Sequence, residues 1–350
     1  MVATGCWQGI IRRYGSSLKI EGIDSPVTLH EGNTPLIPAP RLAKELCPGA
    51  SLFLKYEGLN PTGSFKDRGM TSAITHAHAS GAKVVVCAST GNTAASAAAY
   101  ASRADMHCLV IIPNGKIALG KLAGAVAYGA KVVAIEGSFD DGLNLVRQLG
   151  EKTPIAVVNS VNPARLEGQK TAAWEVTEQL GFVPDWLSLP VGNAGNISAY
   201  WMGFVEAAGA LPRMLGTQAA GAAPLVLGHD VLNPETKATA IRIGKPARGD
   251  QALAAIRESN GVLLAATDDE IFEAYRMVAQ LEGIFCEPSS AAGLAGLQKT
   301  FRAQPDDFRG RTIVCVLTGN GLKDPDSVFE KDAPVIYIEN NIDALMAVAQ

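Results

Sequence analysis

A lysine that could act as a nucleophile or a base, Lys66, lies in the stretch NPTGSFKDRG (60–69). The stretch follows an apolar run, LFLKYE (52–57), and its Asn, Pro and Gly residues are typical of a turn. Ser64 is a candidate N-cap for a helix that would carry Lys66 near its N-terminus. Most loop lysines face solvent, so this stretch alone favours an ordinary charged side chain. Whether Lys66 is reactive therefore depends on the groups that the rest of the chain places beside it.

Two other stretches have the composition of anion-binding loops. STGNT (89–93) follows the apolar run KVVVCA and offers hydroxyls, an amide and helix N-terminal N–H groups, which bind anions or carboxylates. Simple N-capping by its Ser or Thr is an equally good explanation. GNAGN (192–196) follows WLSLPV, and its two glycines let the backbone fold tightly around an anion before the next helix. Neither a G-x-G-x-x-G nor a Walker pattern is present, so GNAGN is interpreted as a phosphate loop of another kind.

Two further strand ends carry a hydroxyl and a cation. Thr318 follows TIVCVL, where its hydroxyl could meet a ring nitrogen or simply cap the next turn. Arg165 ends the stretch NSVNPAR (159–165) after IAVV, and an arginine beside amide and hydroxyl donors suits a phosphate or a carboxylate. The alternative is an exposed arginine at the start of a helix. Together with Lys66, these groups are what a pyridoxal phosphate site needs, and a substrate with its own phosphate would need the additional cations.

The elements that must position these loops alternate along the chain. Short apolar runs predict strands, and amphipathic or Ala-rich segments between them predict helices. Such alternation favours mostly parallel sheets covered on both faces, with ligands bound beyond the carboxyl ends of the strands. The segment 219–252 is irregular and is interpreted as a long excursion that borders the site. The predicted strands are 52–57, 83–89, 108–113, 131–136, 155–160, 186–191, 213–218 and 312–319.

Length and composition narrow the class of protein. The chain has 350 residues, which predicts two domains, and its 47% hydrophobic content is ample for buried cores. The net charge is -4 and no basic stretch stands out, which argues against a nucleic-acid partner. No apolar run is long enough to span a membrane, and the first residues lack the apolar region of a signal peptide. We therefore expect a cytoplasmic protein without a membrane partner.

The cysteines and histidines do not point to a metal site. None of the six cysteines forms a C-x-x-C pair, and Cys87 and Cys315 lie in apolar runs that predict buried strands, so reduced core cysteines are expected. His76 and His78 are two residues apart in a segment with a helical pattern, where they would not share a face.

The motifs of the chain resemble those of a known family. From about Thr28 to Asp324 the sequence resembles the threonine synthases of the shorter bacterial type, within the fold-type-II pyridoxal phosphate enzymes, which are related to the tryptophan synthase beta chain. The motifs that carry the resemblance are EGNTPL, LKYEGLNPTGSFKDRGM, CASTGNTAASAAAYA, IPNGKIALGKL, NSVNPARLEGQKTAAWE, LPVGNAGNISAYW, LGTQAAGAAPL, EPSSAAGLAGL and LTGNGLKDPD.

The resemblance implies an architecture. It is an α/β protein of two three-layer α/β/α domains with mostly parallel sheets, and the active site lies in the cleft between the domains. Residues 1–54 plus 155–350 would form the larger domain, which binds the cofactor phosphate. Residues 55–154 would form the smaller domain, which carries Lys66 and the substrate-carboxylate loop. A homodimer is expected from the resemblance only.

The resemblance also implies a reaction, the conversion of O-phospho-L-homoserine and water to L-threonine and phosphate by γ-elimination and β-addition of water. Lys66 would bind pyridoxal 5'-phosphate covalently and act as the catalytic base. Three further sets of residues would contact the cofactor: Asn92 its phenolic oxygen, Thr318 its ring nitrogen, and the backbone of Gly192, Asn193, Ala194, Gly195 and Asn196 its phosphate. The substrate carboxylate would be bound by Ser89, Thr90 and Thr93. The substrate phosphate would be bound by Lys116, Asn159, Ser160 and Arg165.

Three other interpretations remain. A threonine or serine dehydratase on the same fold would need no second phosphate site, so the cluster 159–165 argues weakly against it. A paralogue without activity would have no reason to keep Lys66, Asn92, GNAGN and Thr318 intact. A nicotinamide-dependent dehydrogenase would require the dinucleotide-binding pattern that is missing here.

Overall fold

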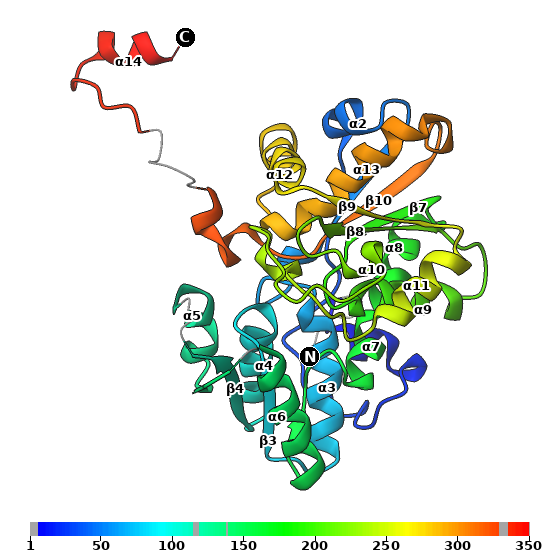
Figure 1. Cartoon of the computed structure of the whole chain (residues 1–350), viewed down its shortest axis with the longest axis vertical. Helices are drawn as coiled ribbons and strands as arrows, with labels where there is room; N and C mark the ends of the chain where they lie inside the picture. Colours follow the sequence, from blue (N-terminus) through cyan, green and yellow to red (C-terminus); the bar gives the residue numbers. More distant parts are fainter. Residues whose placement is uncertain (1–5, 115–118, 138, 329–334, 350) are drawn as a thin grey trace.

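Two parallel-stranded sheets form the framework of the protein in a computed structural model, which describes residues 6–114, 119–137, 139–328 and 335–349. The larger sheet has the strand order β1-β2-β10-β7-β8-β9 and the smaller one β5-β4-β3-β6. In Figure 1 the larger sheet occupies the upper part of the molecule and the smaller sheet the lower part. The strands are β1 (Leu36–Pro38), β2 (Ser51–Tyr56), β3 (Val84–Ala88), β4 (His107–Pro113), β5 (Lys131–Ile135), β6 (Ala156–Val157), β7 (Trp186–Pro190), β8 (Arg213–Ala219), β9 (Val262–Ala266) and β10 (Thr312–Leu317).

The pairing is parallel throughout both sheets except at one edge, where β1 runs antiparallel to β2. Strand β7 is buried along its whole length, and β10 is buried at every residue after its first. Continuous burial on both faces explains why these strands are apolar runs rather than alternating patterns. The carboxyl ends of the strands in each sheet consequently lie along one edge, where the predicted loops are found.

Helices cover both faces of each sheet, which confirms the predicted three-layer α/β arrangement. One face of the larger sheet packs against α2, α12 and α13 through a large apolar core, and the other packs against α8, α9 and α11. The smaller sheet lies between α3, α4 and α5 on one face and α6 on the other. The helices are α1 (Ile10–Tyr14), α2 (Pro40–Leu46), α3 (Lys66–Ala79), α4 (Asn92–Arg103), α5 (Leu119–Ala127), α6 (Phe139–Lys152), α7 (Pro163–Gln169), α8 (Thr171–Leu180), α9 (Gly195–Glu206), α10 (Pro224–Leu227), α11 (Gly249–Glu258), α12 (Asp268–Glu282), α13 (Ala292–Ala303) and α14 (Ile342–Val348).

The strand pairing bears on the domain boundaries. Strand β6 pairs with β3 in the smaller sheet, and β2 continues in the larger sheet as far as Tyr56. The boundaries 55 and 154 expected from the resemblance would cut β2 and leave β6 with the other domain. We propose instead that the smaller domain extends from about residue 57 to about residue 158.

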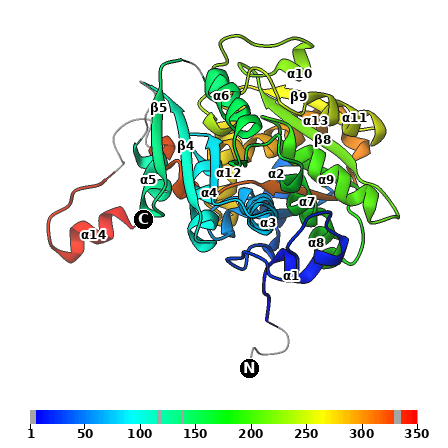
Figure 2. The same cartoon turned by 90° about the horizontal axis from the view of Figure 1, so that it is seen from below.

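Some elements differ from those expected. The predicted strand 155–160 has only two paired residues, while β1 and β9 were not predicted. After the end of β8 at Ala219, the described excursion 219–252 contains α10, one 3-10 turn and the start of α11. Helix α14 is exposed and lies apart from the two sheets in both Figure 1 and Figure 2. None of the helices in the described part of the chain combines the length and apolarity that a membrane span requires.

Candidate active site

The loop before Lys66 and the loop after β10 are joined by backbone hydrogen bonds. The Phe65 N–H donates to the carbonyl of Thr318 at 3.0 Å, and the Asn320 N–H donates to the carbonyl of Gly63 at 2.9 Å. Ser64 and Gly319 form an isolated antiparallel bridge between these two bonds. Because β2 and β10 are parallel neighbours, their carboxyl ends bring the predicted lysine loop and the predicted hydroxyl loop together.

Lys66 is the first residue of α3 and is half-buried. Its Nζ lies 3.7 Å from the centroid of the Phe65 ring. The pKa of Lys66 is lowered to about 7, chiefly by burial and then by the positive charge of Arg165, while the carboxylate of Glu287 opposes both. A substantial fraction of Lys66 is therefore neutral near pH 7, as a nucleophile or base requires.

The prediction that Ser64 is the N-cap of this helix was wrong. Phe65 occupies the N-cap position, and its side chain makes no capping hydrogen bond. Ser64 Oγ instead accepts a long hydrogen bond of 3.4 Å from the Lys66 N–H. The helix therefore begins closer to Lys66 than the turn residues suggested, so the positive end of the helix lies at the amine-bearing residue itself.

The residue after the lysine fastens the turn. Asp67 is fully buried and accepts hydrogen bonds from the Thr62 N–H and Thr62 Oγ1, both at 2.6 Å, and from Ser96 Oγ at 2.6 Å. Burial raises the pKa of Asp67 to about 6 despite these bonds. Gly63, between Thr62 and the helix, has a φ of 84°, a left-handed conformation that favours glycine. The turn and the start of α3 are thus held to α4 through Ser96.

Arg68 anchors the same helix in a buried charge cluster. Its Nε donates to Glu57 at 2.7 Å, and its two terminal nitrogens each donate to Glu175 at 2.7 Å. Lys55 also donates to Glu175, at 3.0 Å. Burial opposes ionisation of Glu175, but the charge and hydrogen bonds of Arg68 prevail and lower its pKa to about 2. This cluster joins β2, α3 and α8, and so fixes the position of the helix that carries Lys66.

Glu287 is a candidate site residue that the sequence did not reveal. It is 5% exposed, and its carboxylate accepts hydrogen bonds from Asn92 Nδ2 at 3.0 and 3.2 Å and a longer one from Thr318 Oγ1 at 3.4 Å. The Glu287 N–H donates to the carbonyl of Gly319 at 3.0 Å. The only available signal was a single acidic residue in the apolar and small-residue stretch CEPSSAAG. The carboxylate links the predicted contact of the phenolic oxygen to the predicted contact of the ring nitrogen.

Two helices present uncapped N-termini to this region. Helix α9 begins in the GNAGN loop with Ala194 as its N-cap, and α4 begins after STGNT with Gly91 as its N-cap. Neither N-cap makes a side-chain hydrogen bond, so the first N–H groups of both helices are left for a ligand or solvent. The N-capping alternative for STGNT is therefore not what the structure has. Ser89 Oγ accepts from the Gly91 N–H at 3.3 Å, and Thr90 and Thr93 are half-buried beside it.

The GNAGN loop has further features of a ligand site. Ala194 has a φ of 63°, which is uncommon for a residue with a side chain and is found preferentially at functional sites. Asn196 is 8% exposed, yet its Nδ2 has no hydrogen-bond partner among the residues that the structure describes. Unpartnered buried donors are rare in proteins, so this amide is a candidate contact for a bound anion.

The stretch 159–165 places a second unpartnered donor nearby. Arg165 is 2% exposed, its Nε has no partner in the described part of the chain, and its Nη1 donates at 3.3 Å to the carbonyl of Val158. Burial lowers the pKa of Arg165 to about 10. Asn159 is tied to β3, since its amide donates to the carbonyl of Ala88 at 2.9 Å and accepts from the Ala88 N–H at 3.0 Å. Ser160 is half-buried in the turn between them, and Lys116 lies outside the described residues.

These groups fit pyridoxal phosphate. The fit rests on a half-buried lysine with a lowered pKa, an uncapped 12-residue helix at a glycine-containing loop, and a buried amide without a partner. Within the described residues no group of three or more histidine, cysteine or carboxylate side chains is placed to hold a metal ion. All six cysteines are free, and Cys87 and Cys315 are buried in β3 and β10 as predicted.

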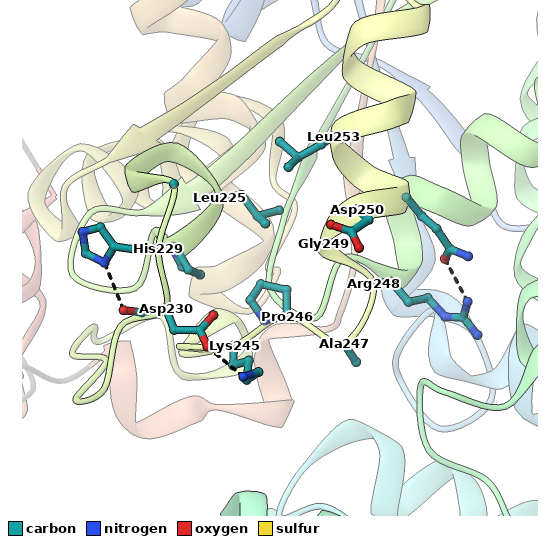
Figure 3. A pocket seen from close by; sticks show the side chains of 13 residues that line it. Leu225, His229, Asp230, Lys245, Pro246, Ala247, Arg248, Gly249, Asp250 and Leu253 are labelled. Carbon is teal, nitrogen blue, oxygen red and sulfur yellow. Dashed lines mark hydrogen bonds and ion pairs between the residues drawn. The ribbon is translucent and has the colours of Figure 1, made fainter.

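A separate cavity of about 430 Å³ lies over the excursion 219–252. Figure 3 shows His229, Asp230 and Lys245 on one side of it and Arg248 on the other, next to the N-terminus of α11. None of the predicted site residues lines this cavity. One lining residue, Arg248, nevertheless contacts the candidate site, because its side chain donates hydrogen bonds to the turn that precedes Arg165.

The chain is similar in sequence to known threonine synthases. A threonine synthase of Synechocystis sp. is 60% identical over 325 residues, which cover 91% of this chain and 84% of that protein. A threonine synthase of Mycobacterium tuberculosis is 57% identical over 339 residues, which cover 94% and 92%.

Solved structures share the fold. Maize serine racemase superposes with a TM-score of 0.74 at 23% identity, over 85% of this chain and 91% of its own. The threonine deaminase of T.th. superposes with a TM-score of 0.69 at 26% identity, over 87% and 94%. Residues 27–319 match the family described as "Pyridoxal-phosphate dependent enzyme", so this chain belongs to the pyridoxal-phosphate dependent enzymes.

Proposed function

We propose the following function and assignment of roles. The chain is a threonine synthase, a pyridoxal phosphate-dependent lyase that converts O-phospho-L-homoserine and water to L-threonine and phosphate. The observation that carries the proposal is the presence of two groups in one site. Lys66 has a pKa lowered to about 7, and Arg165, whose charge contributes to that lowering, is buried and incompletely hydrogen-bonded. The first group suits a base, and the second suits a phosphorylated substrate. The two threonine synthases with 60% and 57% identity support the same conclusion.

The chemistry divides between the cofactor and the chain. Pyridoxal phosphate, when bound, supplies a conjugated ring that delocalises negative charge from the α-carbon of an amino acid. Lys66 Nζ holds the cofactor and later takes the α-proton of the substrate, which the neutral amine can do near pH 7. Since the addition of water at the β-carbon is completed by a proton at the α-carbon, Lys66 also serves as the acid in its protonated form.

The remaining contacts of the cofactor follow from the donors in place. The N-terminus of α9 and the backbone of 192–196 would hold the cofactor phosphate, because aligned helix N–H groups favour an anion. Asn92 and Thr318 would contact the phenolic oxygen and the ring nitrogen, and Glu287 orients Asn92 by accepting from its amide. A neutral hydroxyl at the ring nitrogen cannot hold a proton there as an aspartate would, so the surrounding dipoles must contribute more to stabilising the developing negative charge.

The substrate contacts divide between two loops. Ser89, Thr90 and Thr93, at the uncapped start of α4, would bind the substrate carboxylate. Arg165 and the turn at Ser160 would bind the substrate phosphate. Asn159 uses its amide oxygen and one amide hydrogen on Ala88, so we assign it first to positioning the turn.

A dehydratase remains the second candidate. Its supporting observation is the structural similarity to the threonine deaminase of T.th., at 26% identity. A dehydratase acts on a substrate without phosphate, and such a site would leave Arg165 buried with no anion to bind. Burying a charged group without compensation is costly, which favours the phosphorylated substrate.

We also propose that the protein forms a homodimer and works in the cytoplasm. The dimer is an expectation from the family resemblance. A molar mass of twice the chain mass in light scattering at micromolar concentration would support it, and a monomeric mass would contradict it.

The test of the function is a comparison of substrates. The purified protein with pyridoxal phosphate should release phosphate and form threonine from O-phospho-L-homoserine, with little keto acid from threonine or serine. The Lys66→Ala variant should lose this turnover and the visible absorbance of the bound cofactor, while its circular dichroism is unchanged. Keto acid release from threonine without any phosphate release from O-phospho-L-homoserine would favour the dehydratase.

A further inference from the structure

Arg248 connects the excursion of the larger domain to the loop that precedes Arg165. It lies directly before α11, at the edge of the cavity in Figure 3. Its Nε donates to the carbonyl of Ser160 at 2.8 Å, and one terminal nitrogen donates to the carbonyl of Val161 at 3.0 Å. The other terminal nitrogen donates to Gln251 Oε1 at 2.8 Å. The guanidinium is thus held in one orientation by three acceptors.

These bonds determine which backbone groups of the turn 159–162 remain available to bind a ligand. The turn is closed by a 3.0 Å hydrogen bond from the Asn162 N–H to the carbonyl of Asn159. Arg248 occupies the two intervening carbonyls, those of Ser160 and Val161. The N–H groups of these two residues make no backbone hydrogen bond to any described residue. Successive free N–H groups in a turn form a concavity that binds anions.

The second observation is the side chain of Arg165, three residues after this turn. It is 2% exposed, and among the described residues its Nε has no partner and no carboxylate pairs with it. The positive charge of Arg248 lies close enough to contribute to the lowered pKa of Arg165. Two guanidinium groups held near each other repel, and an anion bound between the turn and Arg165 would relieve that repulsion.

We propose that Arg248 is a positioning residue for the substrate phosphate. It holds the carbonyls of Ser160 and Val161 so that the free N–H groups of the turn and Arg165 form one anion site, and it adds a second positive charge to that site. The inference rests on the proposed function, because the anion is the phosphate of a phosphorylated amino acid. It extends that function by assigning recognition to a residue of the excursion, outside the motifs that suggested the site.

A second phosphate lies close enough to require a distinction. A Cβ atom added to Gly195, in the predicted cofactor-phosphate loop, would lie 4.0 Å from Arg248 Cδ. All three polar atoms of the guanidinium point to Ser160, Val161 and Gln251, and no hydrogen bond joins them to the described residues of that loop. The geometry therefore favours the substrate phosphate over the cofactor phosphate.

The experiment compares Arg248→Ala and Arg248→Lys with the wild-type holoenzyme. Lys245→Ala is the matched control, because Lys245 lines the same cavity but extends to Asp230 on the exposed side. For Arg248→Ala we expect KM for O-phospho-L-homoserine and the inhibition constant of inorganic phosphate to rise roughly tenfold to a hundredfold, the loss typical of charge-assisted hydrogen bonds. We expect kcat and the dissociation constant of pyridoxal phosphate to change less than about threefold, and Arg248→Lys to recover part of the loss.

Three results would overturn the proposal. Weaker binding of pyridoxal phosphate with an unchanged KM would assign Arg248 to the cofactor phosphate. Equal losses in kcat, KM and thermal stability without recovery by lysine would make it a general structural contact. Unchanged constants in every assay would remove it from the site. If the wild-type enzyme itself releases no phosphate from O-phospho-L-homoserine, the proposed function fails, and that failure is separate from these three.

Discussion

The proton affinity of Lys66 is set by three identifiable parts of its surroundings, and each can be changed. Burial and Arg165 lower its pKa from 10.5 to about 7, and Glu287 raises it. An ordinary lysine at pH 7 is neutral in about 0.03% of molecules, whereas an amine with a pKa near 7 is neutral in about half, a difference of roughly a thousandfold. Each pKa unit corresponds to about 1.4 kcal/mol, so the environment disfavours the ammonium by roughly 5 kcal/mol.

The assay is trace acetylation of the protein freed of cofactor, read by mass spectrometry from pH 5 to 11. Acetic anhydride reacts only with neutral amines, so the rate should rise with pH and level off above pH 8 at Lys66. The acetylation rate of an added lysine peptide should continue to rise beyond pH 10. Replacing Glu287 by Gln removes the charge that stabilises the ammonium, so the midpoint for Lys66 should fall. Replacing Arg165 by Gln removes repulsion, so the midpoint should rise.

Two outcomes would refute this reasoning. A midpoint for Lys66 that coincides with that of the lysine peptide would show that burial does not perturb the amine. Shifts of the same sign in Glu287→Gln and Arg165→Gln would show that the two charges do not act on Lys66 in opposite directions. Lys66→Ala identifies the labelled peptide, because its signal must disappear in that variant.

Three other predictions follow from the described contacts. Arg165→Ala should raise KM for O-phospho-L-homoserine roughly tenfold to a hundredfold with little loss of pyridoxal phosphate, since charge-assisted bonds to the substrate are removed; loss of the cofactor instead would assign Arg165 to the other phosphate. Gly319→Ala places a Cβ atom 2.5 Å from Glu287 Oε1. The free energy of unfolding in urea should therefore fall by roughly 1–3 kcal/mol, and cofactor binding should weaken. Unchanged values would mean that the loop moves to accommodate the added methyl group. Arg68→Met leaves buried carboxylates, including Glu175, without their partner and should cost roughly 3–5 kcal/mol at pH 7, measured by urea unfolding. Because the pKa of Glu175 in the folded protein is lowered to about 2, its contribution to stability is present above about pH 4.5 and is lost as the pH falls towards 2. The free energies of unfolding of the wild type and Arg68→Met should therefore converge in acid. A difference that stays constant with pH would contradict the assignment.

Much of the framework was predictable because it depends on local composition. Apolar runs such as VVVCA and TIVCVL are strands that the structure buries on both faces. Parallel neighbours have their carboxyl ends at one edge of a sheet, so once β2 and β10 are paired, the loops of Lys66 and Thr318 must lie together. The strands β1 and β9 were missed for the opposite reason. Strand β1 has three residues, and β9 is only partly buried along most of its length, so neither shows a strong pattern.

The residues that sequence reasoning missed act through tertiary contacts. Glu287 is separated by 195 residues from Asn92, and Arg248 by 88 residues from Ser160. A lone acidic or basic residue in a loop has no periodicity, and its usual position is in solvent. Only the fold shows that one is buried against two predicted cofactor contacts and that the other reaches the turn that precedes Arg165. The Ser64 N-cap was wrong for a related reason, because the bridge between Ser64 and Gly319 overrides the local capping preference.

The charges around Lys66 connect substrate binding to proton transfer. Arg165 lowers the pKa of Lys66, and in the proposed site the same guanidinium binds the substrate phosphate. A bound phosphate would screen that positive charge, and Lys66 would then become a stronger base while the phosphorylated substrate is present. When phosphate leaves, the repulsion returns and the protonated amine is again disfavoured, which promotes return of the proton to carbon. A lysine without a nearby cation would gain no such change during the reaction. Arg165 would therefore contribute to catalysis as well as to binding, and Glu287 would limit the fall in pKa so that the amine can still hold a proton between the two steps.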